Sequence, residues 1–141
     1  MDRRELRAAS SEAGDSLFAV ANDGLVFQAY RGEKPPRFAN HIELECAQIL
    51  DYYGVPWLYE PTAFVLERDE QGRVIEAFAP DFYLPEQDLY VEITVMKQSL
   101  VTRKHRKLRK LRTLYPGIKV KLLYRRDISR LAERFRLPLA S

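Results

Sequence analysis

The chain has 141 residues, of which 46% are hydrophobic and 30% are charged. This length predicts one domain, and the composition excludes an intrinsically disordered, collagen-like or low-complexity protein. No run of residues approaches the roughly 18 apolar residues of a membrane span, and the first residues contain no apolar signal-peptide core. A single cysteine, Cys46, excludes an internal disulfide framework and a Cys-based zinc site. We therefore expect a cytoplasmic protein with no membrane partner.

The charges are distributed unevenly along the chain. Residues 1–37 are neutral overall, residues 38–96 carry two basic and twelve acidic side chains, and residues 97–141 carry fifteen basic and two acidic side chains. An acidic middle followed by a strongly basic end indicates nucleic acid or another anionic partner, with a separate task for the acidic part. The alternative is a solvated charged helix beside an ordinary acidic surface.

The first 39 residues are predicted to form an N-terminal region and residues 40–141 the core domain. Residues 1–15 are polar and read as a frayed tail. Two apolar runs within residues 16–30 flank an Asp-Gly turn and predict a β-hairpin extension. Residues 31–41 contain two consecutive prolines and predict a linker.

A helix is predicted from Asn40, a suitable N-cap, to Tyr53, with Gly54 as its C-terminal stop. Its apolar residues recur at spacings of three and four, which indicates one buried stripe. Beyond it we expect strands over 55–61, 62–68, 73–84, 89–95 and 118–124, and helices over 98–114 and 127–135. This order predicts an α/β fold, a mixed sheet flanked by helices.

The strand at 89–95 has a carboxylate in its middle. Side chains alternate along a strand, so Val91 and Ile93 share one face while Glu92 lies on the other. Asp81 follows Pro80 at the end of the preceding apolar strand, and the turn between the two strands can bring Asp81 and Glu92 together. Converging carboxylates repel each other unless they share a proton or a divalent cation. Oxygen ligands suit Mg²⁺ or Mn²⁺.

These residues resemble the motif of the PD-(D/E)xK nuclease superfamily, which has the restriction-endonuclease-like fold. The match consists of Pro80-Asp81, ten further residues, Glu92-Ile93-Thr94, and Glu43 on the preceding helix. The resemblance implies that Asp81 and Glu92 bind the metal and that Glu43 is a third acidic contributor. Glu43 is preferred to Glu45, which we interpret as a solvated or supporting charge.

One position departs from the family pattern. The motif lysine stands two residues after the second acid, and this chain has Thr94 there. Lys97 is the nearest replacement and is predicted as the catalytic lysine, provided that the strand bends or ends near Val95. Lys104, further along in the basic helix, is the alternative. Thr94 is predicted to orient a water molecule or to fill space.

The helix over 98–114 is strongly basic and contains seven cations and no acid between positions 103 and 112. Contact with phosphates would relieve the repulsion among these cations. We predict a nucleic-acid-binding surface formed by Arg103, Lys104, Arg106, Lys107 and Lys110.

The sequence therefore predicts a Mg²⁺- or Mn²⁺-dependent endonuclease that hydrolyses phosphodiester bonds in DNA. The resemblance implies a product with a 5′-phosphate. The alternative is a catalytically inactive nuclease-fold module that binds nucleic acid or mediates assembly. The chain is too short for a separate recognition domain, so a homodimer or a targeting partner is left open.

Overall fold

The structure is a computed structural model, and it describes residues 26–94, 98–128 and 130. The predicted tail and the first arm of the predicted hairpin lie outside these residues, as does most of the predicted closing helix. Within the described part of the chain, no helix is long and apolar enough to cross a bilayer.

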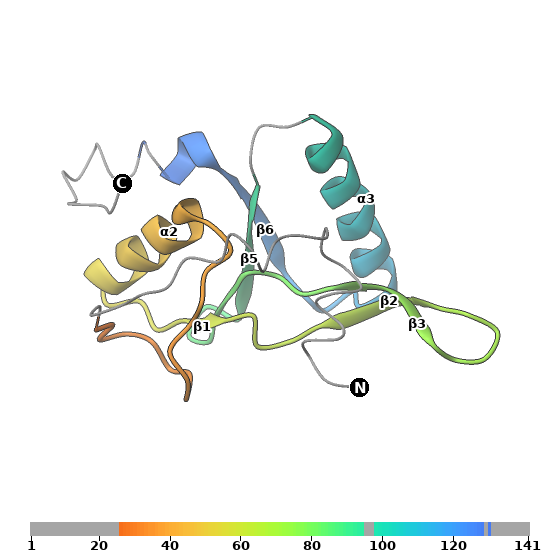
Figure 1. Ribbon diagram of the computed structural model, residues 1–141, viewed down its shortest axis with the longest axis horizontal. Helices are drawn as coiled ribbons and strands as arrows, with labels where there is room; N and C mark the ends of the chain where they lie inside the picture. Colours follow the sequence, from red (N-terminus) through yellow and green to blue (C-terminus); the bar gives the residue numbers. More distant parts are fainter. Residues whose placement is uncertain (1–25, 95–97, 129, 131–141) are drawn as a thin grey trace.

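The centre of the molecule is a four-stranded mixed sheet (Figure 1). Its order is β1 (Leu58–Tyr59), β4 (Phe82–Leu84), β5 (Leu89–Thr94) and β6 (Val120–Tyr124). The pairs β1–β4 and β4–β5 are antiparallel, whereas the pair β5–β6 is parallel. Parallel neighbours need a crossover connection. Helix α3 (Gln98–Leu114) provides it, with the bounds that the sequence predicts.

Helix α2 (His41–Tyr52) lies on the opposite side of the sheet from α3 (Figure 1). The Asn40 side chain accepts a hydrogen bond from the N–H of Glu43 and caps the helix, as predicted. Gly54 follows the helix with a φ of 66°, a left-handed conformation that glycine adopts without a steric penalty. The capping signals therefore fix Glu43 in the first turn of α2.

The prediction of a single strand over 73–84 is wrong. The chain forms β3 (Val74–Phe78), which pairs with β2 (Phe64–Arg68) in a separate two-stranded sheet, and then β4 in the main sheet. The break falls at Ala79-Pro80-Asp81, where Pro80 has no N–H to continue a ladder. This change of sheet places Asp81 immediately before β4.

Strand β5 separates two hydrophobic clusters, as its alternating side chains predict. Val91 and Ile93 pack in the cluster that includes α2, whereas Tyr90 packs in the cluster that includes Leu108 and Leu111 of α3. Both faces of β5 are therefore covered, and Glu92 is buried in the middle of the strand.

The segment before α2 belongs to the first hydrophobic cluster. Ala29 and Phe38 are buried in it, and Tyr30 forms a parallel bridge with Trp57. The side chain of Asp51 accepts hydrogen bonds from the N–H groups of residues 28 and 29. The predicted linker is therefore anchored at its end by Phe38, and residues that precede α2 contribute to the first hydrophobic cluster.

Candidate metal site at the sheet edge

Three acidic residues occupy one row across adjacent strands of the main sheet. The register between β4 and β5 places Asp81 opposite Glu92, one position beyond the last paired residues. The register between β1 and β4 places Glu60 opposite Asp81 in the same way. The N–H of Glu60 donates to the carbonyl oxygen of Asp81 at 2.8 Å, so this row continues past the end of β1.

Asp81 and Glu92 come together as predicted, and each accepts a hydrogen bond from the other strand. The N–H of Asp81 donates to Oε1 of Glu92 at 3.1 Å, and the N–H of Ile93 donates to Oδ2 of Asp81 at 2.8 Å. Both carboxylates are buried, with exposed fractions of 2% for Asp81 and 6% for Glu92. Backbone donors to a carboxylate stabilise its ionised form inside a protein.

Glu43 approaches this row from the first turn of α2 and is also buried. The hydroxyl of Tyr59 donates a hydrogen bond to Oε1 of Glu43, and the N–H of Ala39 donates to the same oxygen at 3.2 Å. Burial, together with the neighbouring Glu43 carboxylate, raises the pKa of Tyr59. Tyr59 therefore keeps its proton and holds Glu43 in position as a hydrogen-bond donor.

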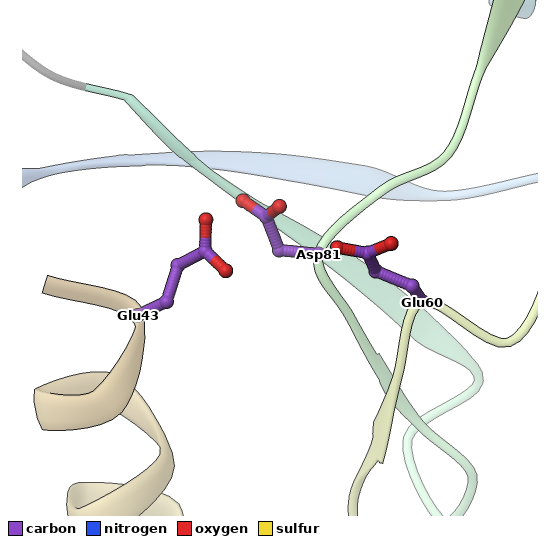
Figure 2. A group of neighbouring side chains, drawn as sticks. All are labelled: Glu43, Glu60 and Asp81. Atoms are coloured by element: carbon purple, nitrogen blue, oxygen red, sulfur yellow. The ribbon is translucent and has the colours of Figure 1, made fainter. Parts of the chain in front are cut away.

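The carboxylate oxygens of Glu43, Glu60 and Asp81 lie within 4.8 Å of one another, and we call this group the acidic cluster. Figure 2 shows the three side chains converging from the helix and from two separate strand ends. Glu60 has a φ of 47°, in the left-handed region that is unfavourable for a residue with a side chain. Oxygen-only ligands of this kind match the preference of Mg²⁺ and Mn²⁺.

The sequence alone does not predict Glu60 as a site residue. Its only local signal is a carboxylate at the end of a short apolar run, before Pro61. Because β1 has two residues, its pattern cannot predict which strand it pairs with or in which register. Glu92, in contrast, is predicted as a metal ligand, but its carboxylate is not among the three that lie within 4.8 Å of one another.

Lys104 reaches the acidic row from α3. Its Nζ lies 2.9 Å from Oε2 of Glu92 and also donates a hydrogen bond to the carbonyl oxygen of Ile93. Burial alone lowers the pKa of Lys104, but the carboxylates of Glu92 and Asp81 outweigh this effect and hold the pKa above its usual value. Lys104 is therefore a protonated cation at neutral pH, directly beside the predicted metal ligands.

The other lysine prediction lies outside the described residues, because Lys97 is among residues 95–97. Thr94, which occupies the position of the motif lysine, is buried at the end of β5. Lys104, the alternative lysine, lies at the site.

Several cations of α3 contact acids of the β2–β3 hairpin. Arg106 and Lys110 form ion pairs with Glu76, at 3.1 and 2.6 Å, and Lys110 also lies 3.4 Å from Glu67. Nζ of Lys107 donates to the carbonyl oxygen of Ala77 at 3.4 Å. The absence of acids within the helix therefore does not leave its cations without partners.

The remaining cation of the predicted nucleic-acid-binding surface, Arg103, has an exposed side chain.

Cys46, which the sequence places in the helix core, is buried in α2, and burial raises the pKa of its thiol. A reactive cysteine needs a low pKa, so Cys46 is part of the core and not a nucleophile.

Comparison with known proteins gives no further guide to function, because no protein-family model, no curated protein and no solved structure matches the chain.

Proposed function

We propose that this protein is a metal-dependent nuclease of the PD-(D/E)xK type, which hydrolyses phosphodiester bonds in DNA. The observation that carries the proposal is the convergence of Glu43, Glu60 and Asp81 within 4.8 Å at the edge of a mixed α/β sheet. Two of these three carboxylates are buried. Burying like charges together is unfavourable, so this arrangement favours a bound cation or a shared proton.

The donor set fits a hard divalent cation. The acidic cluster offers only carboxylate oxygens, and Cys46 and the two histidines of the chain are not part of it. Glu43, Glu60 and Asp81 would hold the metal, with Glu92 beside them through its hydrogen bond from the N–H of Asp81. A bound Mg²⁺ or Mn²⁺ supplies Lewis-acid polarisation of a phosphodiester oxygen and lowers the pKa of a bound water molecule.

The side chains around the acidic cluster have positioning and electrostatic tasks. Lys104 is held by Glu92 and by the carbonyl oxygen of Ile93, so its ammonium group is fixed beside the row of acids. There it would stabilise negative charge that develops on the phosphate. Tyr59 would keep the Glu43 carboxylate oriented toward the cluster. Lys104 thus takes the task that the motif assigns to the lysine at the position of Thr94.

The basic helix would assist in binding the substrate, with a reduced contribution from its paired cations. Arg106 and Lys110 would exchange Glu76 for phosphate, and Arg103 would add a further exposed guanidinium group. Contacts of this kind position a duplex without reading its sequence. We therefore propose a nuclease with structural rather than sequence selectivity.

The experiment that tests this proposal is a cleavage assay with labelled duplex, single-stranded and branched DNA. The wild-type protein should cleave at least one substrate in Mg²⁺ or Mn²⁺ and none in EDTA. Asp81→Asn and Glu43→Gln should reduce the rate by at least about a hundredfold while DNA binding persists. Glu45→Gln is the matched control on the same helix and should leave the rate unchanged.

Two outcomes would overturn the nuclease assignment. One is cleavage that survives both substitutions at the acidic cluster, because the activity would then arise elsewhere. The other is the absence of cleavage on every substrate, in either metal, by a protein that binds DNA. That outcome would favour the inactive nuclease-fold module, for which the buried Thr94 at the motif lysine position is the specific observation.

A further inference from the structure

A groove of 650 Å³ borders the acidic cluster at Glu60. Its lining comes from residues 30–37, which precede α2, and from residues 58–61, which include β1. The groove is lined by three exposed cations, Arg31, Lys34 and Arg37, together with two acids, Glu33 and Glu60. This volume lies within the range of pockets that bind small ligands, so it accommodates a short segment of one strand more readily than the width of a duplex.

The groove and the acidic cluster share residues. Tyr59 and Glu60 line the groove, and each also belongs to the site: Tyr59 donates to Glu43, and Glu60 is a member of the cluster. A strand that lies in the groove would therefore contact at least one carboxylate of the acidic cluster, that of Glu60.

The groove cations differ from those on the inner side of α3. Lys104, Arg106 and Lys110 are ion-paired with glutamates. Within residues 26–94, 98–128 and 130, in contrast, Arg31, Lys34 and Arg37 form no ion pair with a carboxylate; Arg31 donates to the carbonyl oxygen of Gln28. Cations without acidic partners can bind phosphate without first breaking an ion pair.

We propose that this groove binds a single nucleic-acid strand through its phosphate backbone and guides it to the acidic cluster. The inference rests on the proposed nuclease function and deepens it by assigning the substrate a single-stranded segment. Arg31, Lys34 and Arg37 contact successive phosphates along the groove. The bases carry no specificity here, because contacts to phosphate do not read sequence.

The test is the binding of a fluorescein-labelled single-stranded DNA oligonucleotide, followed by anisotropy in EDTA over a series of salt concentrations. One variant replaces all three groove cations by glutamine (Arg31→Gln, Lys34→Gln, Arg37→Gln). The matched control replaces two exposed arginines and one exposed lysine that lie outside both the groove and α3 (Arg68→Gln, Arg125→Gln, Lys119→Gln). Both variants lose three positive charges, so a general charge effect acts on them equally.

The groove variant should bind the single strand at least about tenfold more weakly than the wild type at low salt. The slope of log affinity against log salt concentration should become shallower by about 2, as expected for three lost contacts to a single strand. The control variant should keep most of the affinity, and a blunt duplex should distinguish the two variants much less.

Equal losses in the two variants, or no loss in the groove variant, would overturn the proposal. An equal loss on the blunt duplex would overturn the assignment of a single strand. A single-stranded RNA of the same sequence is the second probe, and it shows whether the strand can be of either kind. Because EDTA prevents cleavage, the result is independent of the nuclease assay: the groove can fail while Asp81-dependent cleavage stands, and the reverse also holds.

Discussion

Replacing Asp81 with asparagine should stabilise the metal-free protein and at the same time abolish its stabilisation by Mn²⁺. Asparagine has nearly the same shape as aspartate, and its amide oxygen can still accept the hydrogen bond from the N–H of Ile93. The substitution therefore removes one negative charge from the acidic cluster with little change in packing.

The magnitude follows from the spacing of the carboxylates. Two unit charges 4.8 Å apart repel each other by about 3.5 kcal/mol at an effective dielectric constant of about 20. Solvent at the partly exposed Glu60 and the positive charge of Lys104 reduce the net effect. We expect Asp81→Asn to raise the free energy of unfolding by about 1–3 kcal/mol without metal. For a chain of 141 residues this corresponds to roughly 3–10 °C in melting temperature.

The assay is thermal unfolding followed by calorimetry, in EDTA and in Mn²⁺. Mn²⁺ at about a hundred times its dissociation constant should stabilise the wild type by about 2.7 kcal/mol, or roughly 9 °C. Asp81→Asn should show almost none of this shift, whereas the control Glu45→Gln should show all of it. The reasoning is refuted if Asp81→Asn melts at a lower temperature in EDTA and keeps the full Mn²⁺ shift.

Three further predictions concern the contacts around the site. Lys104→Gln should leave Glu92 buried without its cation, so the free energy of unfolding measured in urea should fall by about 1–3 kcal/mol. Because the pKa of Lys104 is raised, this contribution should persist at neutral pH and disappear only as the pH rises through that raised value; a loss near pH 7 would contradict it. Burial alone would raise the pKa of Glu76, but the hydrogen bond and charge of Lys110 lower it. The stability difference between wild type and Glu76→Gln should therefore be present above pH 4.5 and shrink as the pH falls below it; a difference that grows in acid would be inconsistent with this pair. Asp51→Ala removes an acceptor for three N–H groups and should cost about 2–4 kcal/mol in urea unfolding, whereas a change under about 1 kcal/mol would show that they find other partners.

The sequence predicts those parts of the site that depend on local patterns. The N-cap at Asn40 and the stop at Gly54 define α2 and so place Glu43 in its first turn. The alternation in β5 and the short turn before it bring Asp81 and Glu92 together. Both predictions use physical rules that act over a few residues, which is why they are confirmed.

The parts that the sequence does not predict depend on pairing between distant segments. Glu60 joins the acidic cluster through the register of a two-residue strand, and no local pattern encodes that register. The ion pair between Glu76 and Arg106 joins residues thirty positions apart, so the basic helix appears unpartnered in the sequence. Its partner becomes visible only when β3 is placed against α3.

The same pairing changes the interpretation of the charge distribution. The acidic middle of the chain has two tasks, since Glu43, Glu60 and Asp81 form the acidic cluster while Glu76 pairs with α3. The basic end is partly neutralised by this pairing. An uneven charge distribution along a sequence therefore indicates an anionic partner only after the internal ion pairs have been taken into account.

The most direct test of the account is the anomalous difference density of crystals grown or soaked with Mn²⁺. We predict one strong peak within coordination distance of the carboxylate oxygens of Asp81 and Glu43, with Lys104 still paired to Glu92. We also predict that this peak is absent from crystals of Asp81→Asn under the same conditions. A wild-type crystal with no peak at the acidic cluster, at a Mn²⁺ concentration that supports cleavage, would contradict it.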